Sequence, residues 1–115
     1  MDSTSSTTTA EIRSRLEADF RRRIGLFYRS LQITPPYHSV EKAVQAIHDA
    51  LGNFQKPVLR AIAADPTALD ALFTQVFLES GLAKKSRGII MKVLADRPEL
   101  LAPDCKPFAE AFRPP

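Results

Sequence analysis

The chain of 115 residues has little that could cross-link it or anchor it in a membrane. Cys105 is its single cysteine, so no disulfide can form within the chain, which favours a reducing compartment. It has no run of about eighteen apolar residues and no charged-then-apolar leader at its start. We therefore expect a soluble intracellular protein, cytoplasmic or nuclear, with no membrane span.

Catalytic and cofactor-binding motifs are also missing. Two histidines and one cysteine are too few for a zinc set, and the sequence has no H-E-x-x-H, G-x-S-x-G or dinucleotide glycine pattern. His48 and Asp49 are neighbours, but adjacent residues on a helix point about 100° apart and cannot form an oriented dyad. We interpret His48 as a surface histidine and Cys105, in a proline-rich turn, as an inert thiol. The sequence predicts a protein that is not an enzyme and holds no metal or cofactor.

The length is that of one domain, and a chain of this size can bury about two-thirds of the surface that it exposes when unfolded. The stretch from Asp2 to Thr9 has no apolar side chain, so it cannot offset the entropy lost on ordering. We therefore predict a disordered, Ser/Thr-rich tail over residues 1–9 and a single helical domain over residues 10–113.

The segment from Asp65 to Gly81 carries a complete set of helix signals. Asp65 can cap the first turn, Pro66 has a suitable φ, and Gly81 offers a left-handed stop. Apolar residues recur at the spacing of one helix face: Leu69, Leu72, Phe73, Val76 and Phe77. So broad a face is normally contacted on more than one side, so we expect this to be the central helix.

An earlier helix begins at a predicted capping box of Thr8 and Glu11. Its apolar residues step along one face at intervals of three and four: Ile12, Leu16, Phe20, Ile24, Phe27 and Leu31. Arg15, Arg22 and Arg29 are seven residues apart and form a stripe about 150° round the helix from that face. This stripe indicates either a cationic binding surface or an ordinary solvated face. The solvated face would be supported by pairs four residues apart: Glu11 with Arg15, Glu17 with Arg21, and Asp19 with Arg23.

The remaining segments predict further helices separated by proline. Two prolines break the chain between Gln32 and His38, and Ser39 is the expected cap of a second helix that ends at Gly52. A third helix is expected over Phe54 to Ala64, with Val58, Leu59 and Ile62 turned inward. A fifth helix starts near Leu82 or Ser86, and short turns follow at Pro98 and from Pro107 to Phe112, the latter as a lid. The fold class predicted is all-α, a compact bundle of five to six helices.

An internal similarity suggests a second arrangement of these helices. Residues 58–69 align with residues 90–101 at an offset of 32, with apolar, basic, alanine and proline positions coinciding. A period of this length is typical of stacked helix pairs, so the domain resembles a short α-solenoid of the armadillo or HEAT kind.

A second basic group lies at Lys84, Lys85 and Arg87. It precedes no strand and lacks the G-x-x-x-x-G-K-S spacing of a phosphate-binding loop. The group could hold an anion at a helix start, Ser86 could be the target of a basophilic kinase, or the segment could be a solvated turn.

The net charge of +3 is unevenly distributed. Residues 1–37 carry six bases against four acids, residues 38–80 three against five, and residues 81–115 seven against four. The basic ends permit a polyanionic partner, but this charge is less concentrated than in a dedicated nucleic-acid binder.

The sequence favours a protein-protein interaction or assembly module of the adaptor type, whose partner protein binds a groove between helices or the first helix. The alternative is binding of RNA, DNA or an anionic surface through six cations: Arg15, Arg22, Arg29, Lys84, Lys85 and Arg87. A third possibility is a homo-oligomer formed through the aromatic face of the first helix. Phosphate binding would weaken steeply with salt, whereas binding in a groove would depend on apolar residues.

Overall fold

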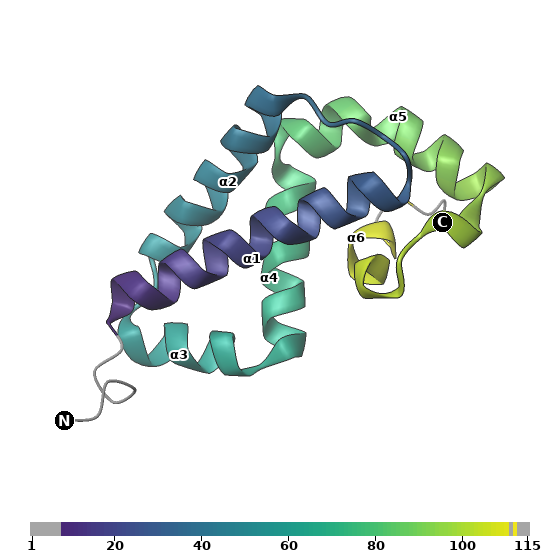
Figure 1. Cartoon of the computed structure of the whole chain (residues 1–115). Helices are drawn as coiled ribbons and strands as arrows, with labels where there is room; N and C mark the ends of the chain where they lie inside the picture. Colours follow the sequence, from purple (N-terminus) through teal and green to yellow (C-terminus); the bar gives the residue numbers. More distant parts are fainter. Residues whose placement is uncertain (1–7, 111, 113–115) are drawn as a thin grey trace.

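The computed structural model describes residues 8–110 and 112, and this part of the chain forms helices and no strands. The predicted all-α class, a compact bundle of five to six helices, is confirmed. Figure 1 shows the elements in chain order. They are α1 (Thr9–Ser30), α2 (Tyr37–Gly52), α3 (Lys56–Ala64), α4 (Pro66–Glu79), α5 (Gly81–Asp96), the 3-10 turns η1 (Pro98–Leu100) and η2 (Pro103–Cys105), and α6 (Lys106–Glu110).

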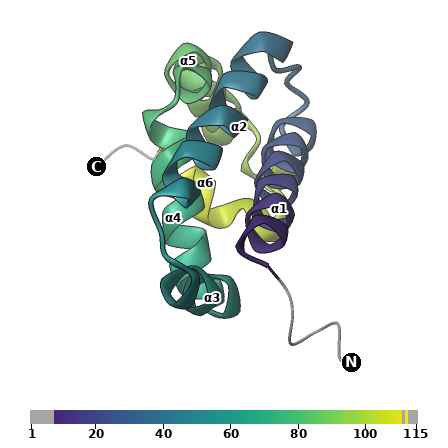
Figure 2. The same ribbon diagram turned by 90° about the vertical axis from the view of Figure 1, so that its left-hand side faces the viewer.

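Helix α4 is the central element, as its apolar face predicted. It packs against α2, α3, α5 and α6, and its Phe73 ring lies 5.2 Å from the Phe20 ring of α1, centroid to centroid. Figure 1 shows α1 crossing in front of α4, and Figure 2 shows the two helices on opposite sides of the bundle. Side chains of α1 and α4 therefore meet in the core.

Two predicted helix starts are confirmed. Thr8 Oγ1 accepts from the Glu11 amide at 3.1 Å, and the Glu11 carboxylate accepts from the Thr8 amide at 3.2 Å, which completes the capping box. Thr8 is thus the N-cap and Thr9 the first residue of α1, at the end of the stretch predicted as a tail over residues 1–9. Residues 1–7 and 113 lie outside the described part. At α4, the Asp65 carboxylate accepts from the amides of Thr67 and Ala68.

The predicted left-handed stop at Gly81 is wrong. Ser80, in an extended conformation, ends α4 and caps α5 by accepting from the Ala83 amide at 3.2 Å. Gly81 is then the first residue of α5, and no glycine in the described residues has a positive φ. The serine hydroxyl satisfies an amide at the new helix, so the chain turns without a left-handed residue.

Two further predictions, the cap of α2 and the inward face of α3, also differ from the structure. Ser39 does not cap α2, because the extended Pro36 takes the cap position and the helix starts at once, leaving Ser39 buried in its first turn. Val58 is 49% exposed rather than turned inward. Because α3 has only nine residues, a narrow stripe containing Leu59 and Ile62 is enough to fix it against its neighbours.

The core is an aromatic cluster that joins both ends of the described chain. The rings of Phe77 on α4 and Phe108 on α6 are stacked with centroids 4.7 Å apart, and Phe27 of α1 lies 5.7 Å from each. Phe112 is also buried, so the expected lid is formed. All six apolar residues predicted for the face of α1 are buried in this core. Little of that face is therefore left for a homo-oligomer formed through it, apart from the parts of Ile12 and Leu16 that line a cleft.

The contact between α6 and α1 distinguishes the bundle from an open solenoid, in which each repeat contacts only its neighbours. The two similar segments, residues 58–69 and 90–101, also differ in their structures. Its first copy passes from α3 through Pro66 into the full helix α4, whereas its second passes from α5 through Pro98 into the single 3-10 turn η1.

Candidate partner-binding cleft

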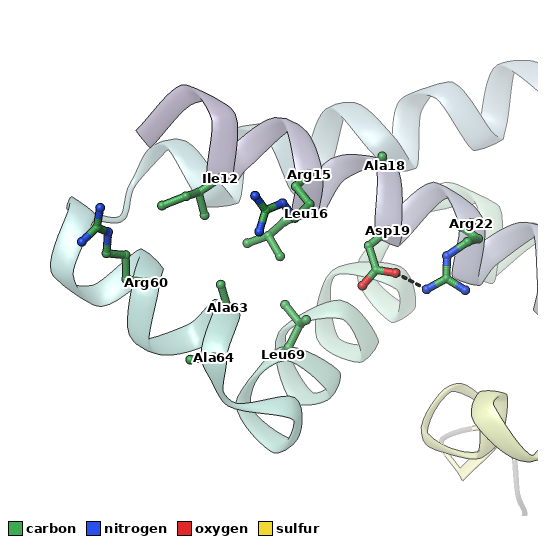
Figure 3. A pocket seen from close by; sticks show the side chains of 10 residues that line it. All are labelled: Ile12, Arg15, Leu16, Ala18, Asp19, Arg22, Arg60, Ala63, Ala64 and Leu69. Carbon is green, nitrogen blue, oxygen red and sulfur yellow. Dashed lines mark hydrogen bonds and ion pairs between the residues drawn. The ribbon is translucent and has the colours of Figure 1, made fainter. Parts of the chain in front are cut away.

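An open cleft of about 780 Å³ lies between α1, α3 and the start of α4. Figure 3 shows the side chains that line it. They are Ile12, Arg15, Leu16, Ala18, Asp19, Arg22, Arg60, Ala63, Ala64 and Leu69. The volume falls in the range of ligand-binding pockets, which is about 300–1,000 Å³.

The floor of the cleft is apolar. Ile12 and Leu16 are one helical turn apart on α1, and Leu69 faces them from α4. The α3 wall ends in Ala63 and Ala64, whose short side chains leave the space between the helices unfilled. The turn at Asp65 then directs α4 away from α3, so the opening is kept.

Arginines form the rim. Arg15 and Arg22 stand two turns apart on α1, and Arg60 lies on α3. Arg15 has no ion pair with any residue that the structure describes. Arg22 pairs with Asp19 while its side chain stays 69% exposed. Three cations therefore border the cleft with one carboxylate among them.

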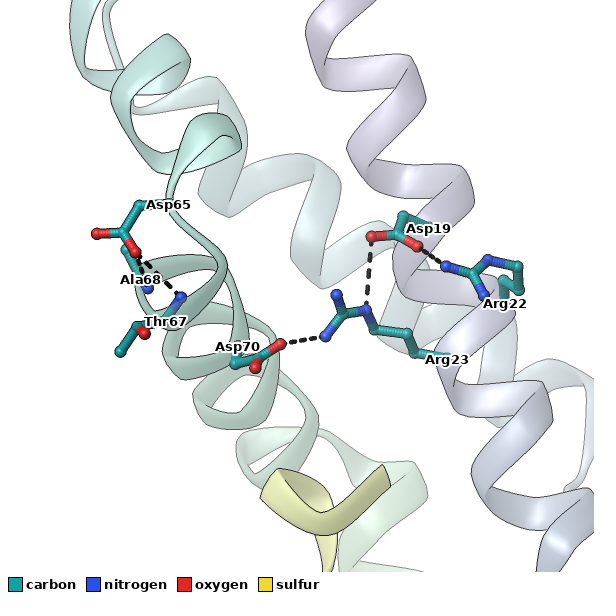
Figure 4. A network of polar contacts seen from close by, with 7 residues as sticks. All are labelled: Asp19, Arg22, Arg23, Asp65, Thr67, Ala68 and Asp70. Carbon is teal, nitrogen blue, oxygen red and sulfur yellow. Dashed lines mark hydrogen bonds and ion pairs between the residues drawn. The ribbon is translucent and has the colours of Figure 1, made fainter. Parts of the chain in front are cut away.

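The carboxylate of Asp19 forms ion pairs with two arginines. Asp19 pairs with Arg22 and, at 3.5 Å, with Nε of Arg23, and Arg23 also pairs with Asp70 of α4 (Figure 4). Because Arg23 is itself paired with Asp70, the charges of these two arginines and two carboxylates balance. Arg15 stands outside this network, and its positive charge at the rim is not offset by any of these carboxylates.

The six cations that the sequence singled out are not brought into one site. Arg15 and Arg22 line the cleft, whereas Arg29 is exposed in the last turn of α1 and does not line it. Lys84 and Arg87 line a separate hollow of about 150 Å³ beside Leu78 and Phe112. Lys85 is exposed and lines neither.

The two basic groups also lie on helices whose buried faces meet. The Tyr28 hydroxyl on α1 donates to the Leu82 carbonyl at the start of α5, at 3.5 Å. The cations of the two groups are exposed and line no common cleft.

The structure does not favour Ser86 as a kinase target. This serine is only 7% exposed, and its side chain is hydrogen-bonded to that of Tyr28. Burial raises the pKa of Tyr28 to about 12, and the hydrogen bond with Ser86 opposes part of that rise. The Ser86 hydroxyl therefore takes part in the contact between α1 and α5.

Of the three predicted pairs along α1, the structure forms only Asp19 with Arg23. Glu11 is used in the capping box, and Glu17 reaches Nδ1 of His48 on α2 at 2.8 Å. His48 is thus a surface residue, as expected, but it has a partner. Arg21 pairs with Glu41 of α2, and this hydrogen-bonded contact raises the pKa of Arg21 and lowers the pKa of Glu41.

Sequence reasoning missed Arg60, Ala63 and Ala64. The available signal was the segment R-A-I-A-A directly before a helix break, where small residues cannot fill the gap to a neighbouring helix. Its significance depends on α1 lying opposite, which the sequence did not specify.

Within residues 8–110 and 112, no three His, Cys, Asp or Glu side chains gather as a metal-binding group. Over the same residues, every helix is too short or too polar to cross a membrane. Comparison of the chain with protein-family models, with curated proteins and with solved structures found no match. The candidate site is therefore defined by geometry and chemistry alone.

Proposed function

We propose that this domain is a non-enzymatic protein-interaction module that receives a segment of a partner protein in the cleft between α1 and α3. The observation that supports this most directly is the cleft itself, with its apolar floor of Ile12, Leu16 and Leu69 beneath an arginine rim. Apolar pockets bordered by arginine are typical of the centres of protein interfaces, where arginine and aromatic anchors contribute most of the binding energy.

Nucleic-acid binding is the second candidate, favoured by the arginines at the cleft. It is less well supported, because Lys84 and Arg87 border a different hollow and add nothing to the same surface. Single-stranded nucleic acids also bind by stacking bases on exposed aromatics. Among the phenylalanines and tyrosines that the structure describes, Tyr37 at the start of α2 is the one that is strongly exposed, and it does not line the cleft.

A photo-cross-linking residue placed at Ala18, on the rim, tests the proposal in an extract of the cells that make the protein. The matched control carries the same residue at Gln45, which is exposed on α2. We expect nuclease-resistant protein adducts from position 18 and not from position 45. Equal adducts at both positions, or none at either, would contradict the proposal.

The nucleic-acid candidate is tested by fluorescence anisotropy of labelled mixed-sequence RNA and DNA at about 50 and 200 mM salt. Micromolar binding that collapses at the higher salt and is lost in Arg15→Ala/Arg22→Ala would favour this candidate over the first. We expect no such binding.

A further inference from the structure

Resting on the proposed function, we infer that the segment received in the cleft is an amphipathic helix with two acidic residues seven positions apart and apolar residues between them. The inference depends on three features of the cleft: its charge, the spacing of its arginines and the shape of its floor. It also depends on the absence of a strand in the part of the chain that the structure describes.

The charge of the rim favours an acidic partner. Arg15 is exposed, and no residue that the structure describes forms an ion pair with it. Arg22 can turn from Asp19 to a partner carboxylate without leaving Asp19 alone, because Arg23 stays beside that carboxylate. Asp19 therefore keeps one ion-pair partner when Arg22 engages a ligand. A basic segment would instead face Arg15 and Arg22 with like charge, which is unfavourable.

The spacing of the arginines sets the spacing of the acids. Seven residues of α-helix rise about 10.5 Å, which is the axial separation of Arg15 and Arg22 on α1. A partner helix lying along α1 presents carboxylates at the same separation when they occupy positions i and i+7. Its positions i+3 and i+4 then fall on the same face, where leucine or isoleucine would meet Leu16 and Leu69.

The floor favours a helix over an extended peptide. Ile12 and Leu16 are only 6% and 4% exposed, so they form the bottom of a hollow beside the short side chains of Ala63 and Ala64, into which apolar side chains of another helix can reach. An extended segment would bring unpaired amides and carbonyls onto this apolar floor. Peptides bound in that form normally pair with a sheet edge, and the described residues contain no strand. A helix satisfies its own backbone groups.

Three fluorescein-labelled peptides of about sixteen residues, built on an alanine-rich helical host, test the inference. The first has Glu at i and i+7 with Leu at i+3 and i+4. The second has the same composition, with both Glu moved to the face opposite the leucines. The third has Lys in place of both Glu.

Fluorescence anisotropy against the full chain should show the first peptide binding about tenfold more tightly than the second or the third. Arg15→Glu/Arg22→Glu should lose the first peptide and gain the third. Arg29→Glu, on the same helix but outside the cleft, should bind like the unaltered chain. Because these three side chains are exposed, all variants should keep the circular dichroism spectrum of the unaltered chain.

The outcomes separate this inference from the proposed function. Equal binding of all three peptides, or no charge reversal in Arg15→Glu/Arg22→Glu, would overturn the acidic helix. If none of the peptides binds while position 18 still cross-links to protein, the acidic helix is rejected and the interaction module stands. If the peptides do not bind and position 18 gives no adduct, both are rejected.

Discussion

Arg23 on α1 holds its guanidinium 5.1 Å from the centre of the Phe73 ring on α4. The same group pairs with Asp70 on α4 and with Asp19 on its own helix. One side chain thus joins the two helices by an ion pair and a cation-π contact beside the cleft. Since it is half-buried, these contacts are less weakened by solvent than those of the exposed arginines.

Replacing Arg23 by methionine should lower the free energy of unfolding by about 1–3 kcal/mol, because Asp70 loses its ion-pair partner and Phe73 its cation. Urea unfolding followed by circular dichroism measures the change. Arg29→Met is the matched control on the same helix and should change stability by less than about 0.5 kcal/mol. Equal stability of the two variants would show that the Arg23 contacts contribute nothing.

Removing the Phe108 ring should destabilise the domain by about 3–5 kcal/mol, because the cavity would open among Phe27, Phe77 and Phe112. Thermal or urea unfolding of Phe108→Ala measures this. Val58→Ala, at the half-exposed position on α3, should cost less than about 0.5 kcal/mol. A Phe108→Ala variant as stable as the unaltered chain would mean that α6 is not docked on the core in solution.

The buried Tyr28 hydroxyl predicts a loss of stability at high pH. Its pKa is raised to about 12 in the folded protein, against about 10 in an unfolded chain. The folded state therefore holds the phenol proton more tightly than the unfolded chain does. The contribution of this group to the free energy of unfolding is complete below a pH of about 10 and is lost as the pH rises towards about 12.

Absorbance at the phenolate band of Tyr37→Phe, which leaves Tyr28 as the single tyrosine, should give a midpoint near 12. The midpoint of the same variant unfolded in urea should be near 10. Coincident midpoints in the two states would contradict the buried position of Tyr28.

Cys105 should react slowly with thiol reagents. It is buried, and desolvation, with the nearby Asp104 carboxylate, raises the pKa of its thiol, so the reactive thiolate is scarce. Titration with a chromogenic disulfide near pH 8 should label it fully only after unfolding. Ser14→Cys, at an exposed position on α1, provides the control and should add one thiol that reacts in the folded state. Rapid labelling of the unaltered folded chain would count against this.

Much of the helical fold could be predicted from the sequence because its causes are local. Periodicity places Ile12, Leu16 and Phe20 on one face whatever surrounds the helix, and all three are buried. The caps at Thr8 and Asp65 act on amides within three residues of themselves. Errors arose where two local rules competed, as at Ser80 and Gly81, where the serine cap of the next helix replaced a glycine stop.

The candidate site was predicted only in part. Arg15 and Arg22 were recognised from their spacing, but Arg29 continues the same stripe and stands outside the cleft. Arg21 and Glu17 were expected to pair with each other, and they turn instead to Glu41 and His48 on α2. Such partners are decided by which helix lies alongside, and sequence spacing within one helix does not contain that information.

By itself, the sequence determined where α1 and α4 begin and which face of α1 enters the core, since capping and periodicity act over a few residues. The tertiary structure alone decided that Arg60, Ala63 and Ala64 of α3 lie opposite Arg15 and Leu16 of α1. Those residues are more than forty positions apart in the chain. Their meeting depends on how α1, α3 and α4 pack together, which the fit of the whole core sets and no single segment encodes.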